Sequence, residues 1–203
     1  MAIRFHKNDL SADVSYQRAV AMDTETLGLN PHRDRLCLVQ LSGGDGNADI
    51  VQIAHGQRAA PRLTALLANP AIVKIFHYAR FDIAVLEAAF GVMTTPIFCT
   101  KIASRLTRTY TDRHGLKDLT KDLLDIDLSK QQQSSDWAAE TLSEAQLAYA
   151  AADVTHLHQL KEKLEQRLVR EGRRELAEQC FGFLPTRARL DLAGWGEEDI
   201  FAH

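Results

Sequence analysis

The sequence predicts an α/β fold in which a mixed central sheet is flanked by helices. Three short runs rich in apolar and β-branched residues, at 20–25, 36–42 and 49–53, are separated by turn-prone segments and indicate an antiparallel meander. The pattern then changes to helix, strand and helix, which places helices on the faces of the sheet. The chain of 203 residues is long enough for one sizeable core, so we expect residues 1–203 to form a single domain.

The elements after the meander are predicted in order. We expect a helix over 61–67, a strand over 72–76 and a helix over 79–90 that ends at Gly91. Further helices are predicted over 97–106, 116–124 and 143–170. The last begins with a capping box, because Ser143 and Gln146 can satisfy each other's backbone donors.

Charge and cysteine content exclude several classes of protein. With 24 basic and 27 acidic residues the net charge is -3, so any polyanion site must be a local basic patch or depend on metal. Cys37, Cys99 and Cys180 lie far apart without a CxxC motif, which argues against a disulfide framework or zinc site and fits a reducing cytosol. With no signal peptide and no apolar run of about 18 residues, we expect a cytoplasmic protein with no membrane partner.

Asp23 and Glu25 stand on alternate residues at the end of the first apolar run. Alternation on a strand puts both carboxylates on one face, where they repel each other unless a cation such as Mg²⁺ or Mn²⁺ lies between them. Chance alone gives roughly three or four such acidic pairs in a chain of this composition. Surface charge is therefore the alternative until partners for the pair are found.

Two later segments supply those partners. Asp82 follows the predicted strand 72–76 in the first turn of the next helix, where its alternative role is to complement the helix dipole. Tyr149 and Asp153 are four residues apart and share one helix face, and the alanines between them allow close approach to a neighbour. A simple hydrogen bond between the tyrosine and the aspartate is the alternative there.

Taken together, the order Asp23, Glu25, Asp82, Tyr149 and Asp153 resembles the DEDDy branch of the 3′-5′ exonuclease superfamily. The resemblance implies an RNase H-like fold. The stretches 133–137 and 142–154 are similar to the corresponding part of ribonuclease D. His77 departs from the pattern, since many of these exonucleases carry Asn at that position.

The resemblance extends to nano-RNase C, a family of short DEDDy enzymes. The segments in which this resemblance is found are Asp23 to Leu29, Cys99 to Ser104, Thr109 to Leu116 and the tail 192–201. Only about 33 residues follow position 170, too few for the helical RNA-binding domains of ribonuclease D. The resemblance implies a 3′-5′ exoribonuclease that degrades very short RNA, dinucleotides above all, and assembles into a homo-octameric ring.

The same resemblance implies the chemistry of the site. Two divalent ions, Mg²⁺ or Mn²⁺, would be held by four carboxylates, with Asp23 bridging both, Glu25 and Asp153 binding one and Asp82 mainly the other. Tyr149 would position or deprotonate the attacking water. The product would be a nucleoside 5′-monophosphate.

Substrate contacts are predicted beside the motifs. Leu27 is expected to lie against the terminal base if the strand continues, and the backbones of Thr24 and Thr26 to hold the 3′ hydroxyl. His77 and Tyr78 are candidates for phosphate contact or stacking. Burial in the core is the alternative for Leu27, and a structural role is the alternative for His77.

A second group of polar residues is a candidate grip for a 5′ phosphate. These residues are Arg108, Arg113, His114, Lys130 and the glutamines 131–133. Solvated loops are the alternative. We expect Trp137 to anchor the core beneath the third motif rather than to contact substrate.

The C-terminal segment, 171–203, poses a separate question. Pro185 is expected to break the helical pattern, which leaves Leu190, Leu192, Trp195 and other large apolar groups in an irregular tail. Such residues must dock on the core or on a neighbouring subunit.

Two alternative functions remain at this point. The same site could serve an exonuclease on longer RNA or on DNA. A non-catalytic RNA-binding protein on this fold would typically have lost an acid, whereas all four are present.

Overall fold

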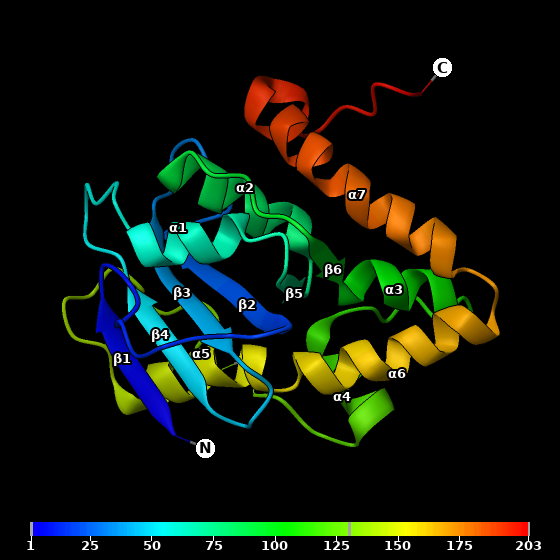
Figure 1. The fold of residues 1–203 in the computed structure, drawn as a ribbon, viewed down its shortest axis with the longest axis horizontal. Coiled ribbons are helices and arrows are strands. Elements are labelled where there is room, and N and C mark those ends of the chain that lie inside the picture. The colour runs from blue at the N-terminus through cyan, green and yellow to red at the C-terminus, as the bar shows by residue number, and fades with distance from the viewer. Residues whose placement is uncertain (1, 130, 203) are drawn as a thin grey trace.

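A six-stranded sheet forms the centre of the molecule in the computed structural model, which describes residues 2–129 and 131–202 (Figure 1). The order across the sheet is β1, β4, β3, β2, β5, β6. The strands are β1 (Ile3–Lys7), β2 (Ala19–Thr26), β3 (Leu36–Ser42), β4 (Ala48–Gln52), β5 (Val73–Phe76) and β6 (Ile97–Cys99). The pairings β2 with β3 and β3 with β4 are antiparallel and the others parallel, so the predicted meander and mixed sheet are confirmed.

The first strand, β1, was not predicted from the sequence. It pairs in parallel with β4 at the edge of the sheet, and its residues are mostly exposed, which leaves no apolar alternation to detect. Asp49 of β4 holds it: Arg4 Nη2 lies 2.7 Å from one carboxylate oxygen and His6 Nε2 2.7 Å from the other. The pairing therefore depends on a buried acid that is 43 residues away from its nearer partner in sequence.

Helices cover both faces of the sheet and extend beyond one of its edges (Figure 1). They are α1 (Pro61–Ala68), α2 (Ala79–Phe90), α3 (Thr100–Thr107), α4 (Leu116–Leu124), α5 (Glu144–Thr155), α6 (Leu157–Arg170) and α7 (Arg174–Leu190), followed by a π-helical turn, η1 (Asp191–Trp195). The helix over 79–90 and its termination at Gly91, with φ 68°, are as predicted. The capping box at Ser143 and Gln146 is also confirmed.

Two predicted helices are wrong in part. The segment 97–106 begins as β6, because Ile97 to Cys99 pair with β5, and becomes helical only at Thr100. The segment 143–170 is two helices that meet at His156. The two halves lie against different partners, since α5 packs on the sheet and α6 on α3 and α4, and this requires a change of direction between them.

The prediction that Pro185 breaks the helix is wrong. Pro185 lies inside α7, which continues because Phe181, Leu184 and Ala188 bury one face of it on both sides of the proline. α7 contacts α2, α3, α6 and β6, and the Phe181 and Phe98 ring centroids are 4.8 Å apart. Residues 174–190 of the C-terminal segment therefore pack on the core as α7.

The turn after α7 is held by a C-terminal ion-pair cluster, which consists of Arg80, Arg187 and Asp191. Arg80 donates to both carboxylate oxygens of Asp191 at 2.6 and 2.7 Å, and Arg187 Nη2 donates to one of them at 2.8 Å. Both arginines also donate to the carbonyl oxygen of Gly196. The cluster joins the turn to the first turn of α2.

α2 and α5 lie on opposite faces of the sheet (Figure 1). Consecutive residues of β2 show this, because Thr24 reaches Asp82 of α2 while Asp23 and Glu25 on either side reach Asp153 of α5. The carboxyl half of β2 is thus the place where both helices meet the sheet.

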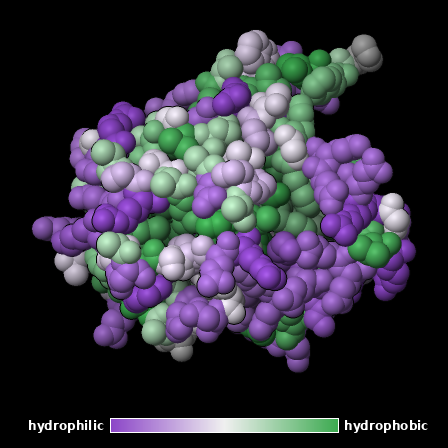
Figure 2. Space-filling model, in the orientation of Figure 1, coloured by the Kyte–Doolittle hydropathy of each residue, from purple (hydrophilic) through white to green (hydrophobic). Residues whose placement is uncertain are grey.

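The surface is divided between polar and apolar regions. On the face in Figure 2, hydrophobic residues gather along the C-terminal segment at the upper right, and hydrophilic residues cover the lower right, where α4 and α6 lie. The exposed large apolar side chains of the C-terminal segment are Leu176, Phe183, Trp195, Ile200 and Phe201. Within the described residues, no helix combines the length and apolar character needed to span a bilayer.

Candidate active site

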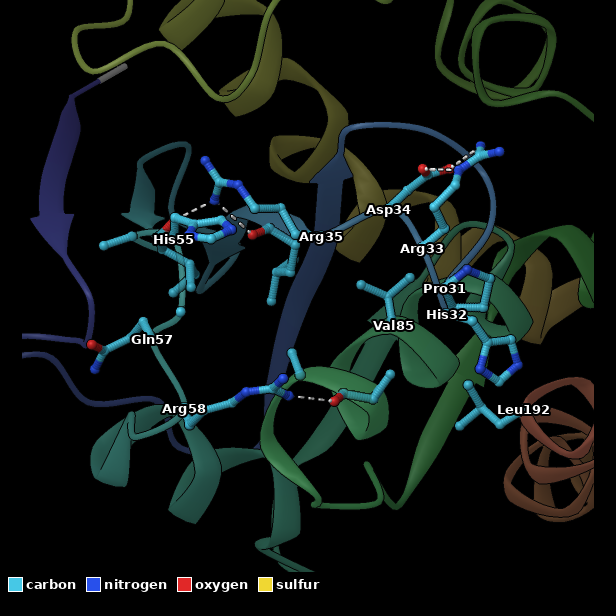
Figure 3. A pocket seen from close by; sticks show the side chains of 16 residues that line it. Pro31, His32, Arg33, Asp34, Arg35, His55, Gln57, Arg58, Val85 and Leu192 are labelled. Carbon is cyan, nitrogen blue, oxygen red and sulfur yellow. Dashed lines mark hydrogen bonds and ion pairs between the residues drawn. The ribbon is translucent and has the colours of Figure 1, made fainter.

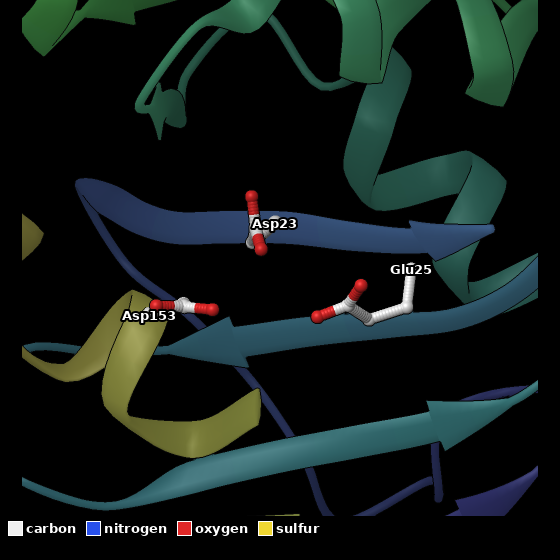
Figure 4. Close-up of side chains that lie close together, drawn as sticks. All are labelled: Asp23, Glu25 and Asp153. Carbon is white, nitrogen blue, oxygen red and sulfur yellow. The ribbon is translucent and has the colours of Figure 1, made fainter. Parts of the chain in front are cut away.

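Three of the four predicted carboxylates converge at the end of β2. Asp23, Glu25 and Asp153 each offer one oxygen, and these atoms all lie within 4.8 Å of one another (Figure 4). We call these three residues the carboxylate cluster. The ladder between β2 and β3 shifts register at Glu25 and Thr26, and α5 brings Asp153 over the sheet from a segment 128 residues later than Glu25.

Asp82 lies beside this cluster rather than inside it. It is buried in the first turn of α2, and its carboxylate accepts a hydrogen bond of 2.8 Å from the hydroxyl of Thr24. Thr24 was predicted to hold substrate through its backbone, and its side chain has a separate task. It orients Asp82 from the opposite face of β2.

The pKa of each of the four carboxylates is raised, first of all by burial. Burial, followed by Asp82, Asp153 and Glu25, raises the pKa of Asp23 well above its usual range. Burial first and then the neighbouring acids raise the pKa of Glu25 to about 8. Burial raises the pKa of Asp82 and of Asp153 to about 7 each. Without a cation, the site therefore favours protonated carboxyl groups.

The donor set fits divalent cations. Within residues 2–129 and 131–202, no lysine, arginine or histidine forms an ion pair with any of these four acids. Hard oxygen ligands at this spacing are what Mg²⁺ and Mn²⁺ prefer. A bound cation would also lower the raised pKa values, because positive charge favours the ionised carboxylates.

Tyr149 stands next to the cluster on the same helix as Asp153. Burial, and then the charges of Asp153, Glu25 and Asp23, raise the pKa of its phenol, so the hydroxyl stays protonated. The buried ring of Trp137 packs against it with centroids 6.0 Å apart and planes inclined at 35°. Trp137 is thus a core anchor, as predicted, and it fixes the position of Tyr149.

Two leucines in the loop after β2 are exposed: Leu27, which was predicted as a substrate contact, and Leu29, which was not. Leu27 is 53% exposed, so its alternative reading as a core residue is wrong. Leu29 is more exposed, at 84%. The two-residue alternation pointed to Leu27 because the strand was expected to continue, but β2 ends at Thr26, whose hydroxyl donates to the carbonyl of Gly28.

His77 and Tyr78 differ in character. The Thr100 hydroxyl donates to Phe76 O at 3.1 Å, so His77 Nδ1 donates to Thr100 at 2.9 Å. Burial, and then Lys101, lower the pKa of His77 to about 3, which keeps the ring neutral. Tyr78 is exposed in a left-handed conformation, φ 76°, and Lys101 Nζ lies 4.1 Å from its ring centroid. Lys101 was not predicted as a site residue.

Only some of the residues predicted to contact a 5′ phosphate are accessible to a ligand. Arg108 is fully buried, paired with Asp122 and bonded at 2.7 Å to the carbonyl of Arg113, so its proposed contact with phosphate is wrong. Arg113 itself is exposed, while His114 shares a hydrogen bond of 2.9 Å with Ser104. Lys130 lies outside the described residues.

A hollow of about 610 Å³ lies between the loop 31–36, the loop 53–58 and the end of α2 (Figure 3). Its arginines are already engaged: Arg33 pairs with Asp34 at 2.7 Å, Arg35 donates to Ile53 O at 2.9 Å and Arg58 donates to Ala88 O at 3.4 Å. None of the five predicted catalytic residues lines it. The hollow is therefore separate from the carboxylate cluster.

The fold and the site define a class of protein. Residues 4–169 match the family model described as 3′-5′ exonuclease, and the chain belongs to this family. Ribonuclease D of Acidiphilium cryptum is 42% identical over 154 residues, and that of Jannaschia sp. is 35% identical over 166. These matches cover 76% and 80% of this chain but 39% and 42% of those proteins, so the chain spans about two fifths of the length of these curated relatives.

More specific similarity comes from solved structures. NrnC of Brucella melitensis with bound Mg²⁺ is 65% identical, with a TM-score of 0.96 and full coverage of both chains. The same protein bound to pGG is 66% identical with a TM-score of 0.97, over 100% of this chain and 99% of that one. Escherichia coli RNase D is 26% identical over 85% of this chain and 45% of its own, with a TM-score of 0.75. The resemblance to nano-RNase C and the RNase H-like exonuclease fold are confirmed.

Proposed function

We propose that this chain is a 3′-5′ exoribonuclease, dependent on two divalent metal ions, that hydrolyses very short RNA, dinucleotides above all, to nucleoside 5′-monophosphates. The observation that carries the proposal is the convergence of Asp23, Glu25 and Asp153 within 4.8 Å, beside Asp82. It is supported by NrnC, which matches this chain over its full length and has been seen with Mg²⁺ and with the short ligand pGG.

Each acidic residue has a proposed task. Asp23 would hold both ions, Glu25 and Asp153 one of them, and Asp82 mainly the other, with Thr24 fixing its orientation. Mg²⁺ or Mn²⁺ bound there would supply Lewis acidity and positive charge at the scissile phosphate.

Tyr149 is proposed to position the attacking water. Its raised pKa keeps the hydroxyl protonated, so it can hydrogen-bond to the water and orient it toward phosphorus. The packing of Trp137 on the ring limits the movement of that hydroxyl. The leaving group is the 3′ oxygen of the penultimate nucleotide.

The substrate would lie along the loop after β2. Leu27 and Leu29 offer apolar contact to the terminal base, and the backbones of Thr24 and Thr26 are proposed to hold the 3′ hydroxyl. Tyr78, with Lys101 over its ring, provides an aromatic surface and a cation for the rest of the dinucleotide. Arg113 is exposed and stays a candidate for phosphate contact, whereas neutral His77 supports Thr100.

Assembly and location are proposed with the activity. The exposed apolar groups of the C-terminal segment, among them Phe183, Trp195 and Phe201, support contact with a second copy, and we propose a homo-octameric ring. The three cysteines, all free, suit a reducing cytoplasm.

The test compares initial rates on a dinucleotide, a single-stranded RNA of about 20 nucleotides and duplex DNA, each with Mg²⁺ or Mn²⁺. We expect the dinucleotide to be cleaved at least about tenfold faster than the others, because the chain offers no surplus of basic charge to hold long polyanions. Faster cleavage of long RNA or DNA would replace the proposed substrate. Full activity in excess chelator would contradict the metal requirement.

A further inference from the structure

Gln40 is a buried polar residue that the proposed reaction has not used. It lies in the middle of β3 with no exposed surface. Neither its amide nitrogen nor its amide oxygen has a hydrogen-bond partner among the residues that the structure describes. Among residues 2–129 and 131–202, it is the one side chain with two such buried atoms. Burial of an unbonded amide is costly, so a residue of this kind needs an explanation.

The position of Gln40 supplies that explanation. In the ladder between β2 and β3, Gln40 stands directly opposite Asp23. Side chains of directly opposed residues lie on the same face of a sheet and within about 5.5 Å at Cβ. That face is the one covered by α5, the helix that carries Tyr149 and Asp153. Gln40 thus lies on the same face of the sheet as the carboxylate cluster, on the strand position next to Asp23.

We infer that Gln40 is a positioning residue for the metal-binding carboxylates, acting through Asp23. Its N–H groups can donate, directly or through a buried water, to the carboxylate oxygens that face away from the cations. Donors in this second layer orient metal ligands, and their loss typically weakens metal binding by about 10- to 100-fold. The inference rests on the proposed metal-dependent function. The amide of Gln40 gains its hydrogen-bond partners only when the carboxylates of the cluster are arranged around bound cations.

Gln52 provides a matched control on the same face of the sheet. It lies on β4 opposite Leu38, two residues from Gln40 along β3. Unlike Gln40, it is bonded: its amide nitrogen donates to the carbonyl of Ala139 at 2.9 Å. Substitution by Met keeps the length of either side chain and removes its hydrogen bonding.

The experiment measures Mn²⁺ binding by titration and the melting temperature in chelator for Gln40→Met, Gln40→Leu and Gln52→Met. We expect the Kd for Mn²⁺ to rise about tenfold or more in both Gln40 variants. Their metal-free melting temperature should stay the same or rise, because an unbonded buried amide is removed. Gln52→Met should melt about 2 to 4 °C lower through loss of its hydrogen bond, with the Kd unchanged.

The outcomes separate this inference from the proposed function. If wild-type protein binds no Mn²⁺, the metal-dependent function itself fails. If wild-type protein binds Mn²⁺ and the Gln40 variants bind it equally well, the function stands and the role of Gln40 is overturned. A metal-free protein that Gln40→Met and Gln40→Leu both destabilise more than Gln52→Met does would also overturn it, since Gln40 would then be a structural residue.

Discussion

The carboxylate cluster and the C-terminal ion-pair cluster differ in whether their acidic groups have basic partners. In the first, Asp23, Glu25 and Asp153 crowd together with no basic partner among the residues that the structure describes. In the second, Asp191 accepts hydrogen bonds from two arginines at 2.6 to 2.8 Å.

The difference indicates which buried charges await a ligand and which ones stabilise the fold. Like charges held together raise the free energy of the folded chain, and they persist where a ligand compensates them. Opposite charges with satisfied hydrogen bonds hold two segments in register, as Arg80 does for α2 and the C-terminal turn.

Asp23→Asn should break the carboxylate cluster with the largest effect. We expect hydrolysis to fall on the order of 1,000-fold, because a ligand proposed for both ions is lost. In chelator at pH 8 the same variant should be more stable than wild type by roughly 1 kcal/mol or more, since burial, and then the neighbouring acids, penalise the ionised form of Asp23 that the unfolded chain favours at this pH. Turnover and chemical unfolding measure the two effects.

Glu144→Gln, an exposed acid at the start of the same helix as Asp153, is the matched control for this prediction and should change neither quantity. If Asp23→Asn lowered the stability of the metal-free protein, the view that this charge is held at the expense of stability would be wrong.

Asp191→Asn should show the opposite behaviour at the C-terminal ion-pair cluster. Two partly buried guanidinium groups lose their carboxylate, so the free energy of unfolding should fall by roughly 2 to 3 kcal/mol. Turnover at saturating substrate should stay within a few-fold of wild type. The measurements are chemical denaturation and steady-state kinetics.

The control for Asp191→Asn is Arg189→Gln, which removes a single contact of 3.3 Å between α7 and Glu87 of α2. It should cost about 1 kcal/mol or less, as exposed pairs do. Equal losses in the two variants would show that pairing geometry does not decide the stability of this region.

His77→Gln sharpens the comparison with a smaller, pH-dependent effect. The unfolded chain binds a proton at this imidazole near pH 6.5, whereas burial lowers the folded pKa to about 3. The contribution of His77 to stability is therefore present above pH 6.5 and lost as the pH falls toward 3, by about 1.4 kcal/mol per pH unit. The difference in unfolding free energy between wild type and His77→Gln should shrink accordingly between pH 7 and pH 5.

Parallel stability curves for wild type and His77→Gln would contradict the lowered pKa and the neutral state of the partly buried ring. His32→Gln, which replaces an exposed imidazole, controls for the loss of a histidine as such.

The sequence was sufficient to predict those elements of the fold that depend on local pattern and spacing. The meander, the helix from Ala79 to Phe90 and the capping box at Ser143 follow from residues near one another in the chain. It was insufficient where packing overrides propensity. Pro185 stays inside α7 because buried residues flank it, and β1 forms because Asp49 holds two of its side chains.

The candidate site divides in the same way. Asp23, Glu25, Asp82, Tyr149 and Asp153 could be named from the sequence, because their residue types and spacing are distinctive and resemble a known motif set. Leu29 and Gln40 could not. The exposure of Leu29 depends on where β2 ends, and the role of Gln40 depends on the register that sets it opposite Asp23.

By itself, then, the sequence determined the fold class, the family and the acidic residues proposed for the candidate site. Only the tertiary structure decided which of these acids stand within 4.8 Å of one another and which buried polar groups lack a partner. The physical reason is that residue type and spacing act along the chain, whereas the distance between β2 and α5 is set by packing across the sheet.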